Sequence, residues 1–419
     1  MKFKKMNYPK YSIILPARNG GEYLPTCVET IISQNFSDYE LIISDNHSTD
    51  NTSNYLNNCS HPNINVIKPP RPLSMVDHFE FALSHAQGTW QMFLGVDDGV
   101  QPYFFELAEV LTKYADTAKI RTIFGVRAYF FWNGCQPIYG NAAVRYGAIN
   151  YIKHKNCKLE ASKVLLGLKK SYFDLPQMYV TAIFKKELLE EVKKRQGEKI
   201  FTSLTPDANL AAICCSLEKK YIESGIPLGW VGSSPSSNGF SFSLSQKNDN
   251  ITNNINQDFL NLNKKSAISY NKLAGNIKFG STVLYFWEAL LQTQNLRKKY
   301  LNIFLMSRLF KTIMFSVVFL YAKSLVGIDR NKHLIEFKKI ISTNKCNYDL
   351  IRYLSLLIPI AHKIFWLISR VFRRITRLFY ESFYYSVDWN SDKCINMILA
   401  SKKVQEMIKD TDLIKKIKL

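Results

Sequence analysis

The chain has 419 residues, of which 47% are hydrophobic, so it can bury a large core and exceeds the usual size of a single domain. Its formal charge is +21, and residues 296–419 carry much of the excess, with 24 Lys or Arg against 9 Asp or Glu. Such a basic tail suits nucleic acid, an anionic bilayer or a polyanionic substrate, and charge alone does not choose among them.

The ends of the chain and its apolar runs predict a cytoplasmic protein. The basic segment Met1–Lys10 is followed only by the short apolar run Tyr11–Pro16, which is too brief for a secretory signal. No uncharged run reaches the roughly 18 residues that a spanning helix needs. The nearest run is Thr312–Ala322, so no spanning helix is expected.

The first 131 residues alternate between β-rich apolar runs and helical patterns, which is typical of βαβ units and a mainly parallel sheet flanked by helices. The predicted fold class is therefore α/β and Rossmann-like. The expected strands are Tyr11–Pro16, Glu40–Asp45, Asn65–Lys68, Trp90–Leu94 and about Arg121–Phe131; the expected helices are Glu22–Gln34, Asp50–Asn58, Ser74–Ala86 and Tyr103–Tyr114.

The remaining chain divides into three parts. Residues 132–240 are less regular, with helical patterns at Lys185–Arg195 and Pro206–Leu217, and they are expected to complete a first domain of residues 1–240. Residues 241–266 are rich in Ser and Asn and predict a linker or loop. Residues 267–419 are expected to form a helical, basic C-terminal region.

The segment Ala361–Tyr380 has the strongest amphipathic pattern of this region. Packing on the rest of the chain, a helix in a membrane interface and nucleic-acid binding all remain open, although the aromatic residues near the cations favour an anionic bilayer and make nucleic acid unlikely. One face carries Ile364, Ile368, Val371, Ile375 and Leu378, and another carries Lys363, Arg370, Arg374 and Arg377.

Polar residues end three of the predicted strands. Asp45 ends one strand, and the pair Asp97 and Asp98 follows another. Each alone fits an ordinary turn or helix cap. Because the carboxyl ends of parallel strands share one sheet edge, together they predict a site for a hard cation and a diphosphate.

Four segments in order and spacing give the sequence a family resemblance. The chain resembles the family 2 glycosyltransferases of the GT-A fold over about its first 105 residues. The segments are Y-S-I-I-L-P-A-R-N-G from Tyr11, E-L-I-I-S-D-N-H-S-T-D-N-T from Glu40, P-R-P-L-S-M-V-D-H-F-E-F-A-L from Pro70 and F-L-G-V-D-D-G from Phe93.

The resemblance implies a nucleotide-sugar site in the half formed by residues 1–131. Asp45 would accept a hydrogen bond from the base, and Asp97 and Asp98 would hold a divalent cation, Mn²⁺ or Mg²⁺, on the donor diphosphate. Arg71 would add positive charge there, or is a solvated loop residue. The pocket would also be lined by Pro16, Ala17, Arg18 and Asn19.

The acidic motif departs from the family pattern at one position. Relatives commonly read G-D-D-D-G, whereas this chain has Val96 before Asp97 and Asp98. Coordination is therefore expected to depend mainly on Asp98, with reduced metal affinity or activity as a consequence.

Family 2 enzymes generally invert the anomeric carbon and need a base that deprotonates the acceptor hydroxyl. Asp207, in L-T-P-D-A-N, resembles the acid that the family places at a helix start. An alternative is purely structural, with Thr205 as N-cap, Pro206 in the first turn and Asp207 complementing the helix dipole.

The expected function is transfer of a sugar from a nucleotide-diphosphate sugar to a glycan or lipid-linked acceptor in cell-surface polysaccharide biosynthesis. The acceptor side would be residues 132–240, and the protein would be peripheral on the cytoplasmic face of the membrane. One alternative is a degenerate GT-A module that binds without transfer, as Val96 suggests. A sugar nucleotidyltransferase is disfavoured because no G-x-G-x-R loop follows the first strand.

Overall fold

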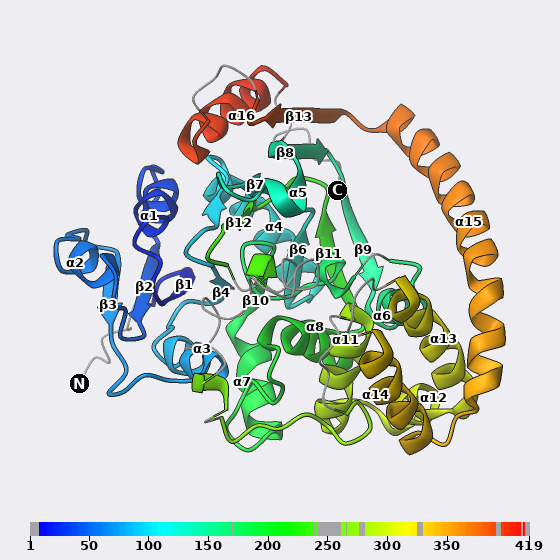
Figure 1. Ribbon diagram of the computed structural model, residues 1–419. Helices are drawn as coiled ribbons and strands as arrows, with labels where there is room; N and C mark the ends of the chain where they lie inside the picture. Colours follow the sequence, from blue (N-terminus) through cyan, green and yellow to red (C-terminus); the bar gives the residue numbers. More distant parts are fainter. Residues whose placement is uncertain are drawn as a thin grey trace.

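The computed structural model describes residues 8–169, 171–237, 239–241, 261–264, 266–275, 281–324, 330–390, 395–411 and 414. The linker expected at 241–266 lies largely outside these residues. Within them the chain builds two sheets with helices packed around them, and a long helix runs along one side of the molecule (Figure 1).

The first four strands form the parallel half of an eight-stranded sheet, in the order β3-β2-β1-β4. The crossovers carry short helices, of which α3 starts at Ser74, whose hydroxyl accepts a hydrogen bond from the Asp77 amide. These elements confirm the predicted βαβ pattern. Their bounds are β1 (Tyr11–Ala17), α1 (Leu24–Ile32), β2 (Tyr39–Asp45), α2 (Thr52–Asn57), β3 (Ile64–Ile67), α3 (Met75–Ser84) and β4 (Trp90–Phe93).

The other half of this sheet is mixed, in the order β10-β6-β11-β9 after β4. β10 is antiparallel to both β4 and β6, β11 is parallel to β6, and β9 is antiparallel to β11. The α/β class predicted from the sequence is confirmed, with antiparallel strands added to its parallel core. The bounds are β6 (Thr122–Gly125), β9 (Ile152–Asn156), β10 (Ala182–Lys185) and β11 (Lys220–Ser224).

A second sheet has the order β13-β8-β7-β12-β5. The single strand expected at Arg121–Phe131 is wrong, because the chain leaves the first sheet after Gly125 and joins the second at Ala128. β6 pairs with β11 in the first sheet, while β7 pairs with β12 in the second, so each of the two short strands belongs to a different sheet. The new bounds are β5 (Gly99–Val100), β7 (Ala128–Phe131), β8 (Ala142–Ile149), β12 (Gly229–Ser233) and β13 (Ser382–Asp388).

Two large apolar clusters hold the helices to the first sheet. One contains residues from α1, α4 and α16, and the other contains residues from α3, α8, α11, α13 and α14. The helices that follow residue 281 therefore share a core with the N-terminal sheet. Further bounds are α4 (Phe104–Ala118), α5 (Gln136–Tyr139), α6 (Cys157–Leu165), η1 (Tyr172–Asp174), α7 (Lys186–Arg195), α8 (Pro206–Leu217), α11 (Thr282–Gln292), η2 (Gln294–Leu296), α12 (Lys299–Met306), α13 (Arg308–Ser324), α14 (Arg330–Thr343), α15 (Tyr348–Phe379) and α16 (Met397–Thr411).

The last part of the chain returns to the N-terminal half. β13 pairs with β8, so the C-terminal region is not wholly helical as expected. α16 then packs beside α1, where Met397 and Val404 are fully buried and the Trp230 indole donates a hydrogen bond to the Ser401 hydroxyl at 2.9 Å.

One described helix is long and apolar enough to cross a membrane by length and composition alone, and it is Tyr348–Phe372 within α15. The sequence analysis chose Thr312–Ala322 instead. That run lies in α13, where residues such as Met314 and Phe315 are fully buried in the protein core. The α15 segment is not an uncharged run, because Arg352, Lys363 and Arg370 interrupt it in sequence.

We predict that Met397→Ala lowers the free energy of unfolding by about 2–5 kcal/mol, because it leaves a cavity where α16 meets the core. Leu399→Ala on the same helix is the matched control, since Leu399 is 46% exposed. Denaturant unfolding of both variants measures the difference. Equal stability of the two variants would show that α16 does not dock through Met397.

Candidate functional site

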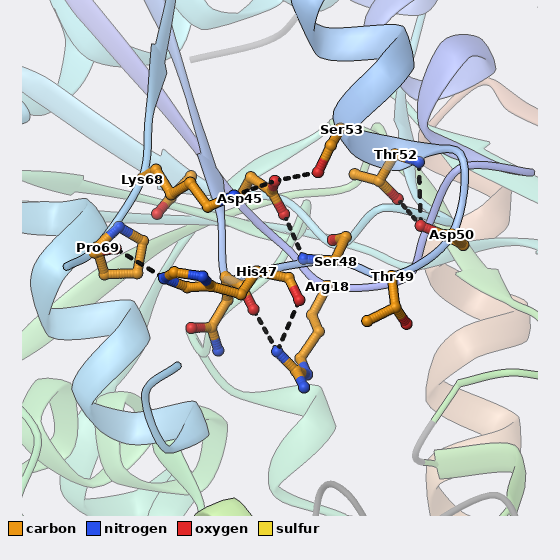
Figure 2. Close-up of polar contacts among 12 residues, drawn as sticks. Arg18, Asp45, His47, Ser48, Thr49, Asp50, Thr52, Ser53, Lys68 and Pro69 are labelled. Atoms are coloured by element: carbon orange, nitrogen blue, oxygen red, sulfur yellow. Dashed lines mark hydrogen bonds and ion pairs between the residues drawn. The ribbon is translucent and has the colours of Figure 1, made fainter. Parts of the chain in front are cut away.

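Asp45 ends β2 beside the end of β1, where Ala17 is its register partner. Its Oδ1 accepts the Ser48 amide at 2.9 Å and its Oδ2 accepts the Ser53 hydroxyl at 2.6 Å, as Figure 2 shows. Lys68 Nζ lies 3.8 Å from Oδ2. Burial raises the pKa of Asp45, but these hydrogen bonds and Lys68 outweigh it, so the pKa lies below 3.8 and the side chain is a carboxylate.

The turn after β1 is tied to the turn after β2. The Arg18 guanidinium donates to the carbonyls of Asn46 and His47 (Figure 2), and the Asn19 amide donates to the Ser48 hydroxyl at 3.0 Å. Asn19 and His47 both have left-handed backbone conformations, with φ of 53° and 57°. These contacts fix the two turns as one polar surface at the carboxyl edge of the sheet.

The remaining residues predicted for this pocket divide by exposure. Pro16 and Ala17 are the last two residues of β1, and the Ala17 side chain is fully buried, so these residues contribute backbone to the edge. Arg71 is exposed in the loop between β3 and α3 and makes no ion pair with any residue that the structure describes. The Arg71 guanidinium is thus accessible to an anion, but no ion pair with a described residue fixes its orientation.

Asp97 and Asp98 lie in the turn between β4 and β5, and both are anchored to β12. Asp98 is 3% exposed, and its two oxygens accept the amides of Gly95 at 2.8 Å and Gly232 at 2.7 Å. Asp97 is partly exposed, and its Oδ2 accepts both the amide and the hydroxyl of Ser234 at 3.0 and 2.8 Å. A Cβ at Gly232 would overlap the Asp97 carbonyl, so only glycine fits there.

Burial and mutual repulsion act on this acidic pair. Burial raises the pKa of Asp97, and burial together with the Asp97 charge raises the pKa of Asp98 to about 8. The two amides that donate to Asp98 act in the opposite direction and favour its ionised form. The turn therefore holds two carboxyl groups close together. A nearby cation is needed to make the ionised form of both favourable.

Val96 occupies the position where relatives carry a further acid, and its side chain packs into the core. It contacts the apolar cluster of α1 and α4, and a Cβ placed on Gly20 would come within 2.7 Å of it. Val96 thus links the turn after β4 to the turn after β1 by an apolar contact. At this position the chain has an apolar packing contact where relatives have a carboxylate oxygen.

Asp207 lies in the first turn of α8, on the other side of β10 in sequence from the acidic pair. Its Oδ2 accepts the Tyr172 hydroxyl at 2.9 Å and its Oδ1 accepts the Ala208 amide at 2.8 Å. Burial raises the pKa of Asp207 above 3.8 despite these donors. Thr205 is the N-cap of α8 and Pro206 is its first residue, as the structural alternative predicted, but the Thr205 side chain makes no cap hydrogen bond.

Arg127 was missed by the sequence analysis and connects the acidic groups. It lies between β6 and β7, where the chain changes sheets, and its guanidinium stacks over the Phe173 ring at 4.9 Å. Its charge lowers the pKa of both Asp98 and Asp207. Among the described residues, its buried Nε has no hydrogen-bond partner. An arginine directly after the buried run T-I-F-G-V was the available signal.

Tyr179 is a second residue that the sequence did not indicate. Burial raises its pKa, and so do the charges of Asp207, Asp98 and Asp97, which places its hydroxyl in the field of all three acids. Its φ is 72°, a conformation that a bulky side chain adopts only under tertiary constraint. The structure therefore brings three acids, an arginine and a strained tyrosine into one electrostatic environment.

The residues present fit a divalent cation that is shared with a substrate. No group of three or more His, Cys, Asp or Glu side chains arranged to hold a metal occurs in the described part of the chain. Mg²⁺ is nevertheless usually held by one or two carboxylates together with substrate phosphates. Asp97 and Asp98 supply such a pair, and Asp97 is the more accessible of the two.

Comparison with known families agrees with this geometry. Residues 12–157 match the model of the family described as glycosyl transferase family 2, a segment that contains the edges of β1 and β2 and the acidic turn. The N-terminal part of the chain therefore resembles glycosyl transferase family 2, as its motifs suggested.

Curated relatives share only part of their length with this chain. A PGL/p-HBAD biosynthesis glycosyltransferase of Mycobacterium bovis (strain BCG) is 35% identical over 98 residues, which are 23% of this chain and 38% of that protein. A chondroitin synthase of Pasteurella multocida is 31% identical over 101 residues, 24% of this chain and 10% of that protein.

Solved structures resemble the chain weakly over most of its length. TarS residues 1–349 of S. aureus with UDP-GlcNAc align at 14% identity and a TM-score of 0.43, covering 80% of this chain and 90% of that one. The mannosyltransferase PcManGT of Pyrobaculum calidifontis, with GDP-Man and Mn²⁺, aligns at 13% identity and 0.38, covering 87% of each chain.

We predict that Asp45→Ala weakens nucleotide binding by about 1.5–3 kcal/mol, the contribution of a hydrogen bond to a charged group. Titration calorimetry with UDP and GDP measures it. Asp116→Ala removes the same charge from an exposed site on α4 and serves as control. If Asp45→Ala folds and binds nucleotide as tightly as the control, Asp45 is only a turn residue that caps Ser48.

Proposed function

We propose that this protein transfers a sugar from a nucleotide-diphosphate sugar to a hydroxyl of a glycan or lipid-linked acceptor, with inversion at the anomeric carbon. The observation that carries the proposal is the turn after β4, in which backbone amides of Gly95, Gly232 and Ser234 hold the carboxyl groups of Asp97 and Asp98. The family match over residues 12–157 supports it.

The donor would bind across the ends of β1, β2 and β4. Asp45 would accept a hydrogen bond from the base in place of one of its serine donors, with Arg18 and Asn19 holding the turn in shape. Arg127, whose charge lowers the pKa of Asp98 and Asp207, would contact an oxygen of the donor through its guanidinium. A guanidinium suits phosphate oxygens because it offers several donors in one plane.

A divalent cation would be held by Asp97 and Asp98 and would supply charge that stabilises the leaving diphosphate. The structure favours Asp97 as the residue in direct contact, whereas the sequence analysis emphasised Asp98. Both oxygens of Asp98 already accept backbone amides, and its side chain is buried. Asp98 would act by charge and by holding the turn.

Asp207 would remove the proton from the acceptor hydroxyl. Burial raises its pKa above the ordinary 3.8, which improves a carboxylate as a base near neutral pH. The Tyr172 hydroxyl donates to Oδ2 and so fixes the carboxylate in one orientation. A role in cell-surface polysaccharide biosynthesis at the cytoplasmic face of the membrane is part of this proposal and is supported by the basic C-terminal region.

We predict that Asp97→Asn and Asp98→Asn fail in different ways. Asp97→Asn should keep the fold but lower cation-dependent transfer at least a hundredfold, since several kcal/mol of leaving-group stabilisation depend on the charge. Asp98→Asn should also destabilise the protein by about 1–3 kcal/mol, because its amide nitrogen would face a buried N–H donor. Activity and unfolding are measured together.

Full activity of both variants in excess chelator would rule out the cation. Val96→Asp is the companion variant: it should strengthen cation binding or leave it unchanged, because it adds an oxygen ligand. Its stability should fall, because a partly buried apolar contact with Gly20 is lost.

We predict that Asp207→Asn abolishes transfer while donor affinity and thermal stability stay within twofold and about 1 kcal/mol of wild type, since general-base catalysis contributes 10²–10⁴-fold in rate. Initial rates with a panel of UDP and GDP sugars measure transfer, and calorimetry measures binding. An unchanged rate would leave Asp207 with a structural role in α8. Nucleotide binding without turnover of any donor by wild type would instead favour a binding module.

A further inference from the structure

α15 presents a continuous apolar face of solvent-exposed side chains. Twelve of its large hydrophobic side chains are between 47% and 68% exposed, and the helix runs along the outside of the molecule in Figure 1. They are Leu350, Tyr353, Leu356, Leu357, Ile360, Ile364, Leu367, Ile368, Val371, Phe372, Ile375 and Phe379. Projected at 100° per residue, all twelve fall within one side of the helix, so they form a single stripe. We call this set the outer face of α15.

The opposite side of α15 is attached to the protein. Ile351 is fully buried against the core shared with α13, and His362 Nε2 lies 3.0 Å from the Leu166 carbonyl. At its end the chain passes into β13, which pairs with β8 along its whole length. The Tyr380 ring contacts Tyr151 at 5.9 Å between these two elements. Both ends and the middle of the helix are therefore fixed to one globular body.

Charges border the outer face in a regular way. Residues 350–380 contain six Lys or Arg and no Asp or Glu. The exposed cations Arg352, Lys363, Arg370 and Arg374 project to one border of the apolar stripe. Long cationic side chains at such a border reach toward anionic headgroups while the stripe enters the acyl region.

We propose that α15 lies flat in the interface of an anionic bilayer, with its outer face in the lipid and its cation border at the headgroups. The 32 residues of α15 give a helix about 48 Å long, which is enough to span a membrane. A spanning helix would place its two ends on opposite sides of the bilayer, whereas both ends here are bound to the same domain. A second copy packed on this face would set two rows of cations beside each other, which charge repulsion opposes.

The proposal does not depend on sugar transfer. It gives the C-terminal region a purpose that suits a lipid-linked acceptor, and it is tested by vesicle binding without any donor. A failure of the sugar-transfer proposal leaves the vesicle result unaffected, so the two are distinguishable.

The test is sedimentation of the full chain with vesicles of phosphatidylcholine alone and of phosphatidylcholine with phosphatidylglycerol at 3:1. The triple variant Leu356→Gln, Ile360→Gln, Leu367→Gln should lose binding at least about a hundredfold, because it removes three apolar side chains from the lipid. The matched control is Leu159→Gln, Ile335→Gln, Leu399→Gln, three exposed apolar residues on α6, α14 and α16, and it should bind like wild type. Circular dichroism checks that each variant folds.

The charge part is tested by Lys363→Gln, Arg370→Gln, Arg374→Gln, which should weaken binding to the anionic vesicles on the order of a hundredfold and make it insensitive to salt. Alkaline carbonate should release the bound wild type. Resistance to carbonate would show a spanning helix and overturn the proposal. A dimer that forms without vesicles and dissociates in the outer-face variant would overturn the proposal as well. Binding of duplex DNA by a protein that does not bind vesicles would also overturn it.

Discussion

The architecture depends on the acidic turn between β4 and β5, which β12 holds in place. Four hydrogen bonds from the backbone and hydroxyl groups of Gly95, Gly232 and Ser234 fix two carboxylates at the point where the two sheets meet. Burying two negative charges is unfavourable unless a positive charge compensates them. The arrangement therefore favours the binding of a cation at the edge where the parallel strands end. Arg127 compensates only part of the negative charge.

The surrounding sheets explain how distant residues meet that turn. β10 runs antiparallel between β4 and β6, so the segment before β10 lies toward the carboxyl end of β4, whereas β10 ends beside Trp90 at the start of β4. The chain leaves the first sheet at Gly125 and enters the second at Ala128, which places Arg127 at the crossing. Tyr179 precedes β10, and Asp207 lies in the first turn of α8, which follows α7. The grouping of these residues is thus a product of strand order and not of sequence proximity.

The C-terminal helices extend the N-terminal core and are not an independent unit. α11, α13 and α14 bury large side chains against the helices of the first sheet, and α16 packs on α1. α15 departs from this pattern, since it keeps its apolar side outward. Exposing so many large apolar residues to water is unfavourable, and such patches mark contact surfaces. The acidic edge and the outer face of α15 on one framework would suit the proposed sugar transfer at a membrane surface.

The sequence by itself determined the βαβ order, the acids at the strand ends and the family resemblance, because these depend on local periodicity and on residues next to each other in the chain. Asp45, Asp97 and Asp98 could be selected in this way. Arg127 and Tyr179 could not, since their importance arises from strands paired across long separations, as in β6 with β10 and β7 with β12. The relative exposure of Asp97 and Asp98 was equally hidden, because it depends on the amide of Gly232, far along the chain. The outer face of α15 was visible as an amphipathic pattern, but only tertiary contacts decided which of its sides is free.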